Sequence, residues 1–71
     1  MQRTSVSSSN LHSVGYDEST SVLEIAFLHG GIYQYSNVPK NIYQGLMAAS
    51  SHGTYFDVNI KKAGYPYRKI S

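Results

Sequence analysis

Two strand-like runs joined by a pair of glycines occupy the segment Val22–Pro39. In the first run, Val22–Leu28, apolar residues recur with a period of two, so one face of the expected strand holds Leu23, Ile25 and Phe27. Adjacent glycines at 30 and 31 accept the positive φ angles of tight hairpin turns. The segment therefore predicts a β-hairpin whose second strand is Ile32–Asn37. Val38-Pro39 ends that strand, because proline has no amide hydrogen to donate to a strand ladder.

A weaker strand precedes the hairpin, and helical periodicity follows it. Leu11–Asp17 has the composition of a strand, and the polar residues behind it are typical of a turn. From Lys40 onward, apolar residues recur at spacings of three and four, which predicts a helix. A second short helix is expected at about residues 52–61, with one face formed by Phe56 and Ile60. The predicted fold class is α+β: a three-stranded antiparallel meander followed by two short helices packed on one face.

The two ends of the chain lack such patterns. Residues 1–9 are rich in serine and have no apolar periodicity, so we expect a flexible N-terminal arm, with a single domain over residues 10–71. Gly64 and Pro66 prevent the second helix from continuing. The C-terminal segment is therefore expected to be extended, either lying across the sheet or adding an edge strand.

Length and composition limit the class of protein. A chain of 71 residues makes one small domain. Without cysteine it has no disulfides and no thiolate ligands, which suits a reducing compartment, and we expect a cytoplasmic location. No apolar run approaches the roughly 18 residues that a membrane span requires, so no membrane partner is expected. The initial Met1 favours a whole short protein of this length.

The register of the hairpin decides which way Tyr33 and Tyr35 face. If the two glycines alone form the loop, Phe27 lies opposite Gln34, and both tyrosines stand on the face opposite Phe27 as an exposed platform. If His29 joins the loop, Phe27 lies opposite Tyr33, and both tyrosines join the core face. The sequence leaves both registers open.

Basic residues gather in the second part of the chain, where Tyr65 and Tyr67 stand beside Arg68 and Lys69. Residues 1–39 carry Arg3 against three carboxylates, whereas residues 40–71 carry five cations against Asp57, for a net charge of +4. Basic side chains attract phosphates, and exposed tyrosines stack on unpaired bases. The same residues also have ordinary roles in a core or a solvated tail. The candidate nucleic-acid-binding residues are Tyr33, Tyr35, Lys61, Lys62, Tyr65, Tyr67, Arg68 and Lys69.

No pattern indicates catalysis or metal binding. His12, His29 and His52 are too far apart for a local ligand motif, and no cysteine joins them. The nucleophile elbow G-x-S-x-G and the phosphate loops G-x-x-x-x-G-K and G-x-G-x-x-G are absent. We therefore expect that the protein is not an enzyme and that it binds neither a metal ion nor a cofactor.

The order of motifs along residues 8–70 resembles the KTSC domain family. It runs through VGYD, LEIAF, GGIYQY with its Tyr-x-Tyr, VP, a helix, SHGTYF and YPYRK. The family is named for domains at the C-terminus of some lysyl-tRNA synthetases, and it also includes small stand-alone bacterial or phage proteins. The association with a tRNA synthetase implies RNA binding by analogy, and the resemblance brings no catalytic residues with it.

Taken together, these features favour a small non-catalytic module that binds RNA or single-stranded nucleic acid through its tyrosines and basic C-terminal region. The alternative is a protein-interaction or self-association module, with a protein partner or a second copy docked on an edge strand or on the second face of the sheet. That face would present Val22, Ala26 and Leu28.

Overall fold

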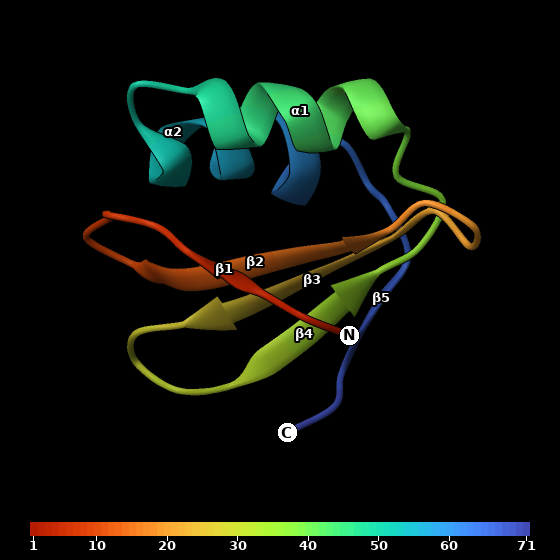
Figure 1. Ribbon diagram of the computed structural model, residues 1–71, viewed down its shortest axis with the longest axis horizontal. Helices are drawn as coiled ribbons and strands as arrows, with labels where there is room; N and C mark the ends of the chain where they lie inside the picture. The colour runs from red at the N-terminus through yellow and green to blue at the C-terminus, as the bar shows by residue number, and fades with distance from the viewer.

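The computed structural model describes residues 1–71 as two layers, with a five-stranded antiparallel sheet covered on one face by helices (Figure 1). In chain order the elements are β1 Thr4–Ser5, β2 Leu11–Asp17, β3 Val22–Phe27, β4 Ile32–Tyr35, α1 Lys40–Ala48, α2 His52–Phe56, η1 Asp57–Lys61 and β5 Tyr67–Lys69. The strands lie side by side in sequence order. The α+β class, the meander and the two helical segments are confirmed.

The sheet has five strands where the sequence predicted three. The additional strands are its edges: β1 falls inside the expected arm and pairs Thr4 with Val14, and β5 pairs with β4. Of the two arrangements expected for the C-terminal segment, the structure therefore has the one in which the segment adds an edge strand. Both strands are only two or three residues long and consist of exposed residues, so they carry none of the apolar alternation by which a strand is recognised.

The hairpin adopts neither of the two expected registers. Ile25 pairs with Tyr33 and Leu23 with Tyr35, and the Phe27 amide donates to the Gly31 carbonyl at 3.0 Å. The loop therefore consists of residues 28–30, one position earlier than the three-residue alternative. Because this shifts the pairing by two residues, both tyrosines still face the helices, as that alternative predicted for the core face.

The core lies between the sheet and the helices. β2 and β3 contribute Leu11, Leu23 and Ile25, which have no exposed surface. The helical segments cover them with Leu46, Phe56 and Ile60, so the predicted Phe56/Ile60 face is confirmed. The second helical segment has the expected span but begins as an α-helix and continues as a π-helix, with the Lys62 amide donating to the Asp57 carbonyl at 3.1 Å.

The N-terminal residues cross the sheet face that lies away from the helices (Figure 1). A Cβ atom at Gly15 would lie 2.5 Å from the Gln2 carbonyl oxygen and 3.1 Å from the Met1 sulfur. Glu24, on this face, is only 4% exposed, and its neighbour Ala26 is 8% exposed. The second face is therefore partly covered by the protein's own N-terminus.

A chain of polar contacts crosses the sheet on that same face. Arg3 Nη1 pairs with Glu24 Oε2 at 2.6 Å, and Arg3 Nε donates to Ser13 Oγ at 3.0 Å. The other carboxylate oxygen accepts from Gln34 Nε2 at 2.9 Å. Gln34 Oε1 in turn accepts from Arg68 Nη2 at 3.2 Å. The chain thus links the N-terminal segment to β5 through the three central strands.

Candidate functional site

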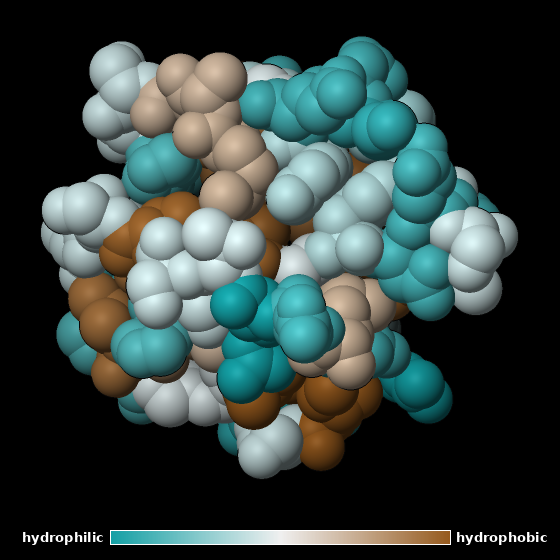
Figure 2. All heavy atoms as spheres, in the orientation of Figure 1, coloured by the Kyte–Doolittle hydropathy of each residue, from teal (hydrophilic) through white to brown (hydrophobic).

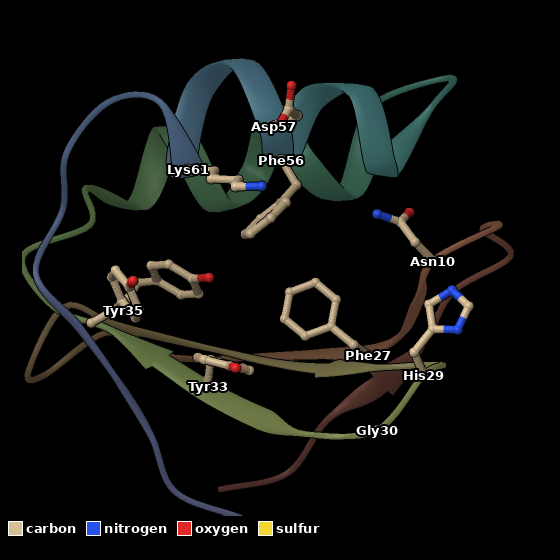
Figure 3. Close-up of a pocket in the computed structure, with 10 residues that line it drawn as sticks. Asn10, Phe27, His29, Gly30, Tyr33, Tyr35, Phe56, Asp57 and Lys61 are labelled. Atoms are coloured by element: carbon tan, nitrogen blue, oxygen red, sulfur yellow. The ribbon is translucent and has the colours of Figure 1, made fainter.

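A groove lined by aromatic side chains opens between the sheet and the second helical segment (Figure 3). Phe27, Tyr33 and Tyr35 rise from the sheet, and Phe56 faces them from α2. Tyr67 of β5 completes the set. The cavity volume is about 700 Å³, within the usual range for small-ligand sites.

Each of the five rings contacts two others, so the contacts form a closed ring. Centroids of Phe27 and Tyr33 are 5.6 Å apart, and those of Phe27 and Phe56 are 5.4 Å apart. Tyr35 lies 5.5 Å from Phe56 and 5.4 Å from Tyr67, and Tyr67 lies 6.1 Å from Tyr33. The tilted and edge-on geometries are those that aromatic pairs prefer. The rings therefore surround one cleft and do not form a row.

The period of two along the strands explains how the sheet supplies these rings. Tyr33 and Tyr35 are two apart in β4, so both point to the helical side, and Tyr67 is the register partner of Tyr35. Tyr35 is buried at 6% exposure, whereas Tyr67 is 65% exposed. The exposed face of Tyr67 makes it the aromatic residue most available to a ligand.

Burial also affects the chemistry of Tyr35. Desolvation, together with the neighbouring Tyr67 and Tyr33, raises the pKa of its hydroxyl to about 12. Tyr35 therefore stays protonated at neutral pH and can offer a hydrogen-bond donor, but it is not poised to act as a base.

Polar groups occupy the rim of the groove. The Lys61 ammonium points into it beside Phe56, and Asn10 directs its Nδ2 amide toward it from the start of β2 (Figure 3). The Asn10 Oδ1 atom already accepts a hydrogen bond from Ser8 Oγ at 3.1 Å. His29 lies at the same end of the groove as Asn10. The rim thus combines one cation with hydrogen-bonding groups that face an aromatic interior.

The π-helix explains why Lys61 reaches the groove. Phe56 and Lys61 are five residues apart, whereas neighbours on one face of an α-helix are three or four apart. The i→i+5 hydrogen bonding of η1 adds a residue to the turn and so moves position 61 closer to the side of the segment that carries Phe56.

Five of the eight candidate residues come together here. Tyr33, Tyr35, Lys61 and Tyr67 line the groove. Lys69 pairs with Tyr33 in the sheet and so shares its face, with its Cε 3.5 Å from the position of a Cβ at Gly31.

The other three candidates lie elsewhere. Lys62 Nζ forms an ion pair with Asp57 Oδ2 at 3.3 Å. Arg68 points to the opposite face of the sheet, where it bonds to Gln34. Tyr65 is half-buried against the core.

Sequence reasoning missed six residues that line the groove, namely Asn10, Phe27, His29, Gly30, Phe56 and Asp57. Phe27 and Phe56 were assigned to the core, which they also join, and their second role depends on the tertiary arrangement. Asn10 and His29 lie in connecting segments where no periodicity predicts a direction for the side chain. Only the three-dimensional contacts reveal their position.

The structure groups no three His, Cys, Asp or Glu side chains closely enough to hold a metal ion. One of the three histidines, His52, forms a hydrogen bond with the backbone: its Nδ1 atom lies 2.7 Å from the Leu46 carbonyl oxygen. None of the helices has the length and apolar character required to cross a bilayer.

Comparison with known proteins gives consistent matches over nearly the whole chain. The sequence model of the KTSC domain matches residues 7–65. An uncharacterized protein of Stutzerimonas stutzeri (strain A1501) is 39% identical over 70 residues, which cover 99% of each chain. A protein of Tsukamurella paurometabola is 34% identical over 56 residues, covering 79% of this chain and 84% of the relative. The crystal structure of a KTSC domain protein from Yersinia pestis superposes with a TM-score of 0.93 at 46% identity, covering 99% and 97% of the two chains.

Proposed function

This chain belongs to the KTSC domain family, and on that premise we propose that it is a non-catalytic module that binds single-stranded nucleic acid, RNA in particular. The observation that carries the proposal is the aromatic groove with a lysine at its rim. Aromatic side chains stack on unpaired bases of any sequence, and lysines neutralise the phosphates beside them.

The distribution of charge supports this ligand. Two lysines supply positive charge at the groove, with Lys61 on its rim and Lys69 beside Tyr33. The carboxylate on the rim, Asp57, is paired with Lys62. An anionic ligand with a flat aromatic part therefore fits both the charge and the surface.

Protein interaction through the second sheet face has less support. Ala26, one of its three apolar residues, is almost covered, and the N-terminal segment crosses the same face. Figure 2 shows apolar residues in separate small groups among polar ones over the face in view. Stable association usually needs a larger continuous apolar patch.

Titration of the labelled protein with single-stranded RNA, single-stranded DNA and tRNA tests the proposal, with amide chemical shifts as the readout. We expect shifts that gather at Tyr33, Lys61 and Tyr67 and weaken with added salt. Silence with all three ligands would contradict the proposal and favour a protein partner.

Replacing Tyr67 by alanine isolates the stacking contribution. Because the ring is exposed, Tyr67→Ala should keep the fold but weaken binding by roughly 1–3 kcal/mol, whereas Tyr67→Phe should keep most of the affinity. The matched control is Val58→Ala, which truncates an exposed apolar side chain that does not line the groove. Equal affinities for Tyr67→Ala and the control would show that the groove is not the binding site.

A further inference from the structure

Resting on the proposed function, we infer that the groove accepts one nucleotide unit at a time: a single unstacked base with the two phosphates that flank it. A run of stacked bases does not fit this site. Three observations support the inference, namely the arrangement of the rings, the number of free cations and the position of Asn10.

The rings surround one cleft. Proteins that bind several successive bases present aromatic residues in a row along the path of the strand. Here the contacts close on themselves, from Phe27 through Tyr33, Tyr67, Tyr35 and Phe56 back to Phe27. A base that enters this cleft has its faces against protein rings and is separated from the bases next to it.

The free cations are also few. Of the six lysines and arginines, four are engaged: Arg3 with Glu24, Lys40 with Glu18, Lys62 with Asp57 and Arg68 with Gln34. Only Lys61 and Lys69 form no ion pair and no side-chain hydrogen bond. Both lie on the side of the groove, so two phosphates are the most that this site neutralises without breaking an existing contact.

Asn10 gives the cleft a group that can read the edge of a base. Its Oδ1 atom is held by Ser8, and its Nδ2 donor points into the groove opposite the rings of β4 (Figure 3). Stacking alone is tolerant of sequence, whereas an amide donor favours a base that presents an acceptor on its edge. The cleft is thus suited to hold a base and also to discriminate between bases.

Nucleoside 3′,5′-bisphosphates, which carry one base and two phosphates, test this inference against twelve-residue homopolymers of the same base. We expect the bisphosphate of the preferred base to saturate the protein and to shift the same amides as its homopolymer. For the homopolymer, log K should fall with log salt with a slope of about −1.4, the value for two neutralised phosphates of a single strand. Tighter binding of the bisphosphate would identify a free nucleotide as the ligand, and tighter binding of the homopolymer a base within a strand. The shared amide shifts and the homopolymer slope are what support one unit per site.

The failures of the two proposals are distinguishable. A homopolymer that binds with a slope near −2.8, while the bisphosphate leaves the spectrum unchanged, would overturn the single-unit inference and retain nucleic-acid binding, because four phosphates would then be neutralised. If no ligand shifts any amide, the proposed function fails as well.

Single substitutions test which side chains contact the phosphates and the base. Lys61→Gln and Lys69→Gln should each reduce the magnitude of the slope by about 0.7, whereas Lys40→Gln, at a lysine that pairs with Glu18 and does not line the groove, should leave it unchanged. Asn10→Asp replaces the amide donor by an acceptor of the same size. It should weaken binding of the preferred base by about tenfold and reduce the difference between bases. A slope altered by Lys40→Gln, or an unchanged base preference in Asn10→Asp, would overturn the corresponding assignment.

Discussion

At the scale of single residues, the burial and the contacts of Glu24 are features that the sequence could not predict. Its place in an alternating strand predicted a polar residue on the second face of the sheet, but not that the face is covered or that Arg3, 21 positions away, reaches it. Burial by itself raises the pKa of Glu24. Hydrogen bonds from Gln34 and Arg3, together with the Arg3 charge, outweigh burial and hold the pKa below its ordinary value.

Glu24 should therefore make the protein less stable in acid. A carboxyl whose pKa is lower in the folded state contributes stability above its unfolded pKa, about 4.5, and loses that contribution as the pH falls through the folded value. Glu24→Gln should flatten the dependence of the free energy of unfolding on pH between about 5 and 3. Urea unfolding across this range measures the effect.

The matched control is Glu18→Gln, which removes an exposed carboxylate whose only ion pair, with Lys40, lies on the surface. Exposed pairs of this kind contribute about 0–1 kcal/mol. Equal slopes for the wild type and Glu24→Gln would show that the buried carboxylate does not contribute to acid sensitivity.

At the scale of elements, the sequence predicted the strands and helices that have a recognisable pattern of residues. β2 has the predicted bounds Leu11–Asp17, which strand-forming residues followed by a polar turn indicate, and α1 begins at Lys40 as expected from apolar residues at spacings of three and four. The Ser51 side chain caps α2, accepting from the Thr54 amide at 3.3 Å. The change from α-helix to π-helix at Asp57 and the two short edge strands depend on tertiary contacts, so no local pattern predicts them.

The contact between Gly15 and the N-terminal segment provides a test at this scale. Because a Cβ at position 15 would collide with the Gln2 carbonyl, Gly15→Ala should displace residues 1–3 and destabilise the protein by about 1–3 kcal/mol. Chemical denaturation measures the change. In a variant that begins at Thr4, the same substitution should cost much less; an equal cost in both backgrounds would mean that the segment does not lie over Gly15.

At the scale of the whole molecule, the candidate site is assembled from residues far apart in the chain. Asn10 lies before β2, Phe27 ends β3, Tyr33 lies in β4, Phe56 ends α2 and Tyr67 begins β5. The sequence predicted that tyrosines and basic residues were involved, since their types suit the chemistry. It could not separate the lysine on the groove from the lysine paired with Asp57, because that depends on which face each side chain takes.

A site that joins sheet, helix and both ends of the chain should couple ligand binding to global stability. A ligand present at ten times its Kd stabilises the folded state by about 1.4 kcal/mol, which corresponds to a rise in Tm of roughly 6–11 °C for a domain of this size. Thermal unfolding with and without the nucleoside bisphosphate measures it. Tyr67→Ala should lose most of the rise at the same ligand concentration, and an undiminished rise would place the ligand elsewhere.

The position of β1 and β5 at opposite edges of the sheet also has a mechanical consequence. Because the two terminal strands are not paired with each other, tension applied between the chain ends would peel each from its own neighbour, one hydrogen bond after another, and would not shear them together. The strands that yield first are two and three residues long, so the force required should be small. When β5 detaches, Tyr67 and Lys69 leave with it, and a pull on the chain would release a bound base before the core opens.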